Sequence, residues 1–262
     1  MNSIRHIKSK ITFERVSNIL LVIILVGMVV SSVIFKGESV LEDIKITMLD
    51  DAKTRNLIYE EEVKDILVKN FDNQLIGRKL KEVDVQLIEE VLDMNPFIKE
   101  ADVYISATNV LHIRIDQRKP MLRLVDTRGV NFYMDEEGYR LPLSKNYTCR
   151  VPVVTGYIPV PEYVYLFNNE DIFQQLYTLG KAIREDDFIR ALIEQIDVNV
   201  RNEITLIPKL GTAKIIFGEI EDVDNKFFKL KRYYKKGLPY AGWDKYKSIN
   251  LSYDNLVFCK RA

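Results

Sequence analysis

Histidine, cysteine and tryptophan are scarce in this chain of 262 residues, which has two histidines, two cysteines and one tryptophan. No cluster of cysteines and histidines has the spacing of a zinc site. A Ser/His/Asp relay would have to use His112, because His6 lies in the basic N-terminal tail. His112 falls in an alternating stretch that predicts an ordinary strand. No phosphate-binding loop occurs among the 11 glycines, so we expect neither a metal nor a cofactor.

Carboxylates are plentiful, but their arrangement does not suit catalysis. Hydrolysis of a glycoside needs two carboxyl groups that face each other across a cleft, one of them with a raised pKa. The densest group, Asp135 to Glu137, is consecutive and stands beside Gly138. We interpret this group as a solvated turn and predict that the chain has no catalytic residues and is not an enzyme.

The chain also lacks an excess of one charge, because 38 basic and 38 acidic side chains cancel. Residues 1–15 carry four basic side chains and one acidic one, a net charge of +3, so the remainder carries −3. Nucleic-acid binding favours clustered basic charge and a high pI. We therefore expect no nucleic-acid partner.

Cys149 and Cys259 are far apart in the sequence. An oxidising compartment would permit a disulfide between them, but two isolated cysteines do not reveal a pairing. Two separate buried thiols are the simpler interpretation, and the question stays open at this point.

One long apolar run, VSNILLVIILVGMVVSSVIF at residues 16–35, contains no charged side chain. About 20 helical residues span about 30 Å, the hydrocarbon thickness of a bilayer. A cleaved signal peptide usually has a shorter apolar stretch, and a buried core helix would have a polar face. We therefore predict a retained transmembrane signal anchor at 16–35. The basic tail 1–15 places the N-terminus in the cytoplasm and the bulk of the chain outside.

Residues 39–118 change periodicity in the order strand, helix, helix, strand, strand. Alternation of apolar and polar residues predicts the strands, and stripes at helical spacing predict the helices. Asn95 and Pro96 end the second helical stripe. The predicted segments are 41–48, 59–69, 84–94, 98–105 and 111–115.

Residues 119–262 are predicted to be mostly strands with two flanking helices. Apolar stripes at helical spacing occur at 170–184 and 222–234. We expect a mostly antiparallel beta domain, so the whole exterior part is α+β. The predicted strands lie at 121–125, 131–143, 193–200, 203–208, 213–218 and 246–258.

Four phrases carry a family resemblance, and they follow the apolar run in order. They are NPFIKEADVYIS at 95–106, VLHIRIDQRKP at 110–120, VPVVTG at 151–156 and YKSINLSYDNLVF at 246–258. Together they resemble the FtsQ/DivIB family of bacterial cell-division proteins. The resemblance implies a POTRA domain (β-α-α-β-β) at 39–118 and a beta domain at 119–262. The chain departs from the family pattern at Leu256, which stands near the glycine usual in the last turn.

The resemblance also implies a function, that of a non-enzymatic scaffold of the divisome at the inner membrane and division septum. It would link early division proteins to septal peptidoglycan synthesis by binding FtsB and FtsL through the edge strand of the beta domain. Other divisome proteins would contact the POTRA domain and the transmembrane helix. The alternative is a single-pass POTRA-bearing protein of a secretion or export system. The implied partner-binding residues are Ser252, Tyr253, Asn255 and Val257 on the last strand and Arg232 and Tyr233 on the preceding helix.

Two further aromatic residues near this region remain ambiguous in the sequence. Phe228 could face either the core or a partner. Trp243, the only tryptophan, fits either a partner contact or a lid on the core.

Overall fold

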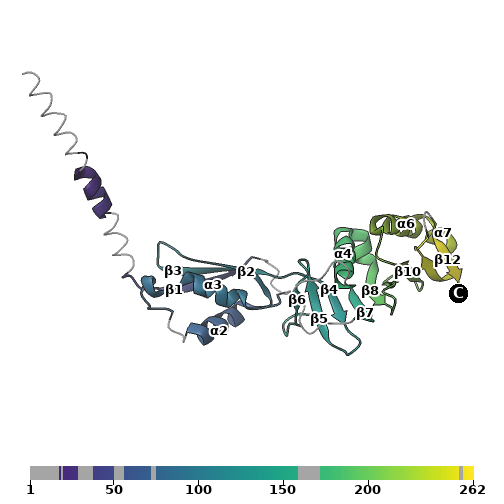
Figure 1. The fold of residues 1–262 in the computed structure, drawn as a ribbon, viewed down its shortest axis with the longest axis horizontal. Coiled ribbons are helices and arrows are strands. Elements are labelled where there is room, and N and C mark those ends of the chain that lie inside the picture. The colour runs from purple at the N-terminus through teal and green to yellow at the C-terminus, as the bar shows by residue number, and fades with distance from the viewer. Residues whose placement is uncertain are drawn as a thin grey trace, which may run out of the picture. The chain divides into compact units, whose positions relative to one another are not determined.

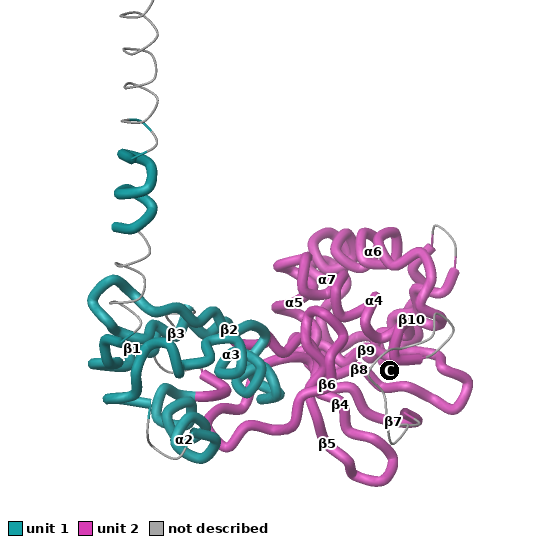
Figure 2. Tube along the Cα trace, turned by 60° about the vertical axis from the view of Figure 1, so that its left-hand side comes forward, with its two compact units in different colours: residues 1–50, 59–116 teal, residues 51–58, 117–262 magenta. Residues whose placement is uncertain are grey.

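The structure, a computed structural model, describes residues 18, 20–28, 38–49, 56–71, 75–158, 172–253 and 256–262. The chain divides into two compact units, residues 1–50 with 59–116 and residues 51–58 with 117–262 (Figure 2). Each unit is built on a sheet of its own.

The predicted anchor is only partly described. Residues 20–28 are helical and their apolar side chains are exposed. Apart from residue 18, the remainder of 16–35 lies outside the described residues, as does the tail 1–15. Among the described helices, none is both long enough and apolar enough to cross a membrane.

The first unit has the predicted order of strand, helix, helix, strand, strand (Figure 1). In its three-stranded sheet, β3 lies between β1 and β2, and β1 runs parallel to β3. The central strand β3 alternates as expected, with Leu111, Ile113 and Ile115 fully buried. The elements are β1 (Asp43–Met48), α2 (Glu60–Phe71), the 3-10 turn η1 (Leu80–Glu82), α3 (Val85–Asp93), β2 (Ile98–Ile105) and β3 (Val110–Gln117).

Helix α3 shows how the sequence determines this unit locally. The carboxylate of Asp84 accepts a hydrogen bond from the backbone N–H of Leu87 and so caps the first turn. The buried residues Ile88 and Leu92 are one turn apart, so a single apolar stripe packs on the sheet.

The second unit is built on a nine-stranded sheet in the order β12-β11-β10-β9-β8-β7-β4-β5-β6. Its core lies between this sheet and the helices, and α4, α5 and α6 contact one another. The strands are β4 (Pro120–Val125), β5 (Asn131–Asp135), β6 (Arg140–Leu141), β7 (Val153–Gly156), β8 (Ile193–Val198), β9 (Ile204–Pro208), β10 (Lys214–Gly218), β11 (Tyr246–Asn250) and β12 (Phe258–Arg261). The helices are α4 (Ile172–Glu185), α5 (Asp187–Leu192), α6 (Val223–Lys236) and α7 (Leu238–Ala241).

The α+β class holds, and five of the eight strand pairings in this sheet are antiparallel, as expected, but three are parallel, so the sheet is mixed. Strands β4, β7 and β8 are mutually parallel neighbours, and β10 is parallel to β11. A parallel pair needs a crossover connection, usually a helix. The helices α4 and α5 supply it between β7 and β8, and α6 with α7 supplies it between β10 and β11. The predicted flanking helices are therefore crossover helices.

Candidate protein-interaction edge

Strand β12 forms one end of the nine-stranded sheet. It pairs antiparallel with β11, from Asn250 opposite Phe258 to Tyr246 opposite Arg261. The backbone N–H of Ala262 donates to the carbonyl of Lys245. Because the direction of the backbone groups alternates along a strand, the N–H and C=O groups of Phe258 and Lys260 also point toward β11. The backbone groups of Cys259 and Arg261 therefore point away from the sheet. An edge of this kind can pair with an added strand.

The connection between β11 and β12 is held in place from three sides. The backbone N–H of Leu251 donates to the carbonyl of Ile216, at 2.9 Å. The side-chain oxygen of Asn250 accepts from the backbone N–H of Ser252, at 2.8 Å. From α6, the ammonium of Lys229 donates to the carbonyls of Leu251 and Tyr253, at 3.0 and 2.7 Å. Residues 251–253, the first part of this connection, are therefore held by contacts from β10, β11 and α6.

Large apolar side chains are exposed beside this edge. Tyr253 is 55% exposed, Leu256 is 68% exposed and Phe258 is 61% exposed. The rings of Tyr253 and Phe258 meet edge to face, with centroids 6.3 Å apart. Exposed aromatic side chains are frequent anchors in protein interfaces, because each offers a large area with few rotatable bonds.

The residues predicted for the last strand lie mostly before it. Strand β11 ends at Asn250, so Ser252 and Tyr253 occupy the connection and not an edge strand. The chain leaves the ladder there because Asn250 bonds to Ser252 and Lys229 holds the following carbonyls. Val257 stands directly before β12 and packs against the core. Asn255 lies outside the described residues.

The two residues predicted on the preceding helix differ in exposure. Arg232 is exposed on α6, whereas Tyr233 packs against the core. The hydroxyl of Tyr233 is buried and has no hydrogen-bond partner within the described residues. Burial raises the pKa of this phenol, with the nearby thiol of Cys259 adding to the effect. Arg232 is the member of this pair that is available to a partner.

The two ambiguous aromatic residues are now placed. Phe228 on α6 is 58% exposed, so it does not belong to the core. Trp243 packs edge to face on Tyr234, with ring centroids 6.1 Å apart, and remains 37% exposed. Trp243 therefore covers part of the core and also presents a surface.

Sequence reasoning missed three residues of this edge, Lys229, Leu256 and Phe258. Leu256 and Phe258 lie inside the phrase YKSINLSYDNLVF, and a strand predicted to begin at residue 258 would have singled out Phe258. The contact of Lys229 joins α6 to a connection more than 20 residues later. A contact between residues so far apart in the sequence cannot be predicted from a local pattern.

The residues considered for catalysis serve structural roles. His112 stacks on Tyr104, with ring centroids 5.0 Å apart. Asp135 is 2% exposed, which corrects its interpretation as part of a solvated turn. Its carboxylate pairs with Arg118 at 2.9 Å and accepts from the backbone N–H groups of Glu137 and Tyr139. Asp135 is buried because these three donors surround it.

Metal and thiol chemistry has no assembled centre in the described part of the chain. No group of three or more His, Cys, Asp or Glu side chains in it could hold a metal ion. Cys149 and Cys259 are both free thiols. Burial raises the pKa of Cys149 to about 11, which suppresses its reactive thiolate form.

The chain combines a small α+β unit with a mixed-sheet unit whose sheet has an open edge at β12. Residues 39–116 match a family model described as "POTRA-like domain", and residues 119–260 match one described as "FtsQ/DivIB, C-terminal related". No curated protein matches the chain. The second model covers more than half of the chain, which therefore belongs to the FtsQ/DivIB family. This is a family of non-enzymatic division proteins, and the chain is a division-associated scaffold.

Proposed function

We propose that this chain acts in the divisome by binding FtsB, and with it FtsL, through edge strand β12 and the neighbouring face of α6. The observation that carries the proposal is the open edge at Phe258–Arg261 with Tyr253, Leu256 and Phe258 exposed beside it. The outward backbone groups would give affinity to an added partner strand, and the aromatic side chains would give specificity.

The division site at the inner membrane is the proposed location, with residues 16–35 as a single anchor and residues 39–262 on the outer side. The apolar run and the basic tail before it support this topology. At this site the scaffold would link early division proteins to septal wall synthesis. Other divisome proteins would contact the POTRA unit, residues 39–118, and the anchor.

A proline at position 261 tests the edge directly. Arg261→Pro removes a backbone N–H that points away from the sheet, so pairing with β11 should survive while pairing with a partner strand loses a hydrogen bond. Full-length chain co-expressed with FtsB and FtsL should lose most of its capture of the pair. The matched control, Arg261→Ala, removes the same side chain and keeps the N–H, so its capture should stay near the parent level.

Circular dichroism of the purified variants checks that both remain folded. Equal capture by Arg261→Pro and Arg261→Ala, with both folded, would contradict partner binding through this edge. The cellular role has its own test, because depletion of the protein should give filaments without septa. Normal division under depletion would count against the assignment.

A further inference from the structure

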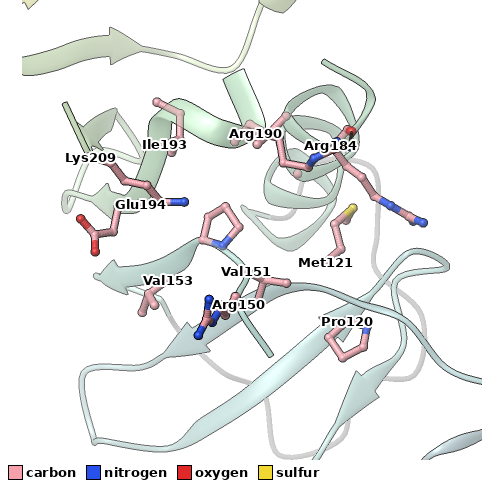
Figure 3. Close-up of a pocket in the computed structure, with 13 residues that line it drawn as sticks. Pro120, Met121, Arg150, Val151, Val153, Arg184, Arg190, Ile193, Glu194 and Lys209 are labelled. Carbon is pink, nitrogen blue, oxygen red and sulfur yellow. Dashed lines mark hydrogen bonds between the residues drawn. The ribbon is translucent and has the colours of Figure 1, made fainter. Parts of the chain in front are cut away.

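A groove far from β12 along the sheet has an unusual charge for this protein. Its cavity of about 410 Å³ lies at the first residues of β4, β7 and β8, which are parallel and so begin at the same end of the sheet (Figure 3). Four cationic side chains and one carboxylate, Glu194, line it, although the whole chain has a net charge of zero. The cations are Arg150, Arg184, Arg190 and Lys209.

The floor of this groove is apolar and closely packed. Met121, Ile183 and Ile193 line it and are almost completely buried. Gly180 lets α4 approach the sheet here, since a Cβ atom at this position would lie 2.8 Å from Cδ1 of Leu122 and 2.9 Å from Cε of Met121. The packing of α4 on β4 therefore sets one wall of the groove, and the segments before β7 and after β9 complete it.

Two of the four cations are already engaged. Arg184 pairs with Glu136, and Arg190 pairs with Asp187 and donates to the backbone carbonyl of Arg184 at 2.9 Å. These contacts hold the two guanidinium groups at the wall of the groove.

The other two cations are available to a ligand. Within the described residues, neither Arg150 nor Lys209 has an ion-pair or hydrogen-bond partner for its side chain, and both residues are exposed. They come from different segments, one before β7 and one after β9. Figure 3 shows the four cationic side chains at separate places around the groove.

We propose that this groove binds an acidic segment of a partner protein, in which aliphatic side chains accompany the carboxylates. Carboxylates would pair with Arg150 and Lys209, and an aliphatic side chain would cover the half-buried Val151 and Pro152, which also line the groove. A small inorganic anion would leave these apolar side chains unused and would meet no converging set of cations. The site does not rest on the proposed binding by β12, since it lies at β4, β7 and β8 and uses none of the edge residues.

A peptide-binding measurement on the full-length chain tests the groove. The probe is a fluorescein-labelled peptide, Glu-Leu-Glu-Val-Glu, followed by fluorescence anisotropy. Loss of two ion pairs by charge reversal in Arg150→Glu/Lys209→Glu should weaken binding at least about tenfold. A second probe with serine in place of leucine and valine should bind the parent several-fold more weakly, because it keeps the charge and lacks the aliphatic groups.

A matched variant separates a specific groove from general charge attraction. Lys214→Glu/Lys236→Glu makes the same change in net charge at two exposed lysines that do not line the cavity, so its affinity should stay within about twofold of the parent. Unfolding temperatures should be similar for all three proteins, since all four substituted residues are exposed.

Three results would overturn the proposal. The first is no saturable binding to the parent at peptide concentrations up to about 1 mM. The second is equal weakening by the two charge-reversal variants. The third is displacement of the peptide by equimolar inorganic phosphate, which would indicate a simple anion site. None of these outcomes depends on FtsB or FtsL, so failure here is distinguishable from failure of the edge-strand proposal.

Discussion

The two ends of the nine-stranded sheet differ in the length of the outermost strand and in the residues beside it. At one end, β6 has two residues, and the chain after it is tied down because Ser144 and Asn146 both donate to the carbonyl of Leu57. At the other end, β12 has four residues and exposed apolar side chains beside it. A very short edge strand resists extension by another chain, whereas a longer edge with aromatic neighbours favours it. The comparison favours the β12 end over the β6 end as the proposed site for a partner strand.

The largest effect is expected from breaking the β6 end. Asp135→Ala would leave the mostly buried guanidinium of Arg118 and two backbone N–H groups without their acceptor. Stability should fall by about 3 kcal/mol, measured by urea unfolding, while the protein that remains folded keeps its partner capture. The control Glu137→Ala removes a more exposed partner of Arg118 and should cost less than about 1 kcal/mol. Equal losses of stability in the two variants would show that the burial of Asp135 does not increase its contribution to stability.

Two exposed tyrosines allow a direct test of the difference between the ends. Tyr253 stands beside β12 and Tyr139 beside β6, with exposures of 55% and 44%. Tyr253→Ala should weaken binding of FtsB/FtsL by about 2 kcal/mol, roughly thirtyfold, because it removes a central aromatic contact. Tyr139→Ala should leave binding unchanged and cost only the contact with Arg118, about 0.5 to 1 kcal/mol of stability. Titration calorimetry measures the affinity for FtsB/FtsL. Similar affinities for the two variants would contradict a difference in partner binding between the two ends of the sheet.

Lys229 sharpens the comparison, because it positions the β12 end without lying on the edge strand. In Lys229→Met the carbonyls of Leu251 and Tyr253 lose their shared donor, so the connection before β12 loosens. Affinity for the partner should fall about tenfold, and stability by only about 1 kcal/mol. Lys236→Met, on the exposed last turn of α6, serves as the control and should change neither quantity appreciably. A loss of stability with unchanged affinity would make Lys229 a purely structural residue.

The elements that the sequence predicts well are those set by local periodicity. The first unit follows its alternating and helical patterns closely, and the stripe of α3 is the stripe that packs. The parallel core β4-β7-β8 was not predicted, because strand pairing joins segments that local patterns cannot connect.

The candidate site shows the same division between local and tertiary causes. Sequence resemblance led to Tyr253, but the place of Tyr253 in the connection depends on contacts from Asn250 and Lys229. Asp135 was misplaced for a similar reason, since its partner Arg118 comes from 17 residues earlier and buries it. Contacts of this kind have no signature in a single sequence.

The smallest expected effect is the loss of stability at acid pH that comes from two carboxylates, Asp186 and Asp126. Burial alone would raise the pKa of Asp186 and of Asp126, but the hydrogen bonds they accept outweigh it and lower both values below the ordinary 3.8. Asp186 accepts from Lys231 and from the first N–H groups of α5, whereas Asp126 accepts from the turn between β4 and β5. A lowered folded-state pKa adds stability that is present above 3.8 and is lost as pH falls through the folded value.

Asp186→Asn should therefore cost about 1 kcal/mol at neutral pH and less at an acid pH below the folded-state pKa, where the parent carboxylate is itself protonated. Asp126→Asn should show the same convergence with a larger loss at neutral pH, because the side chain of Asp126 is 1% exposed and that of Asp186 is 23% exposed. Urea unfolding at the two pH values measures both. If the deficit of either variant persists undiminished at low pH, the lost stability comes from packing and not from the charge of the carboxylate.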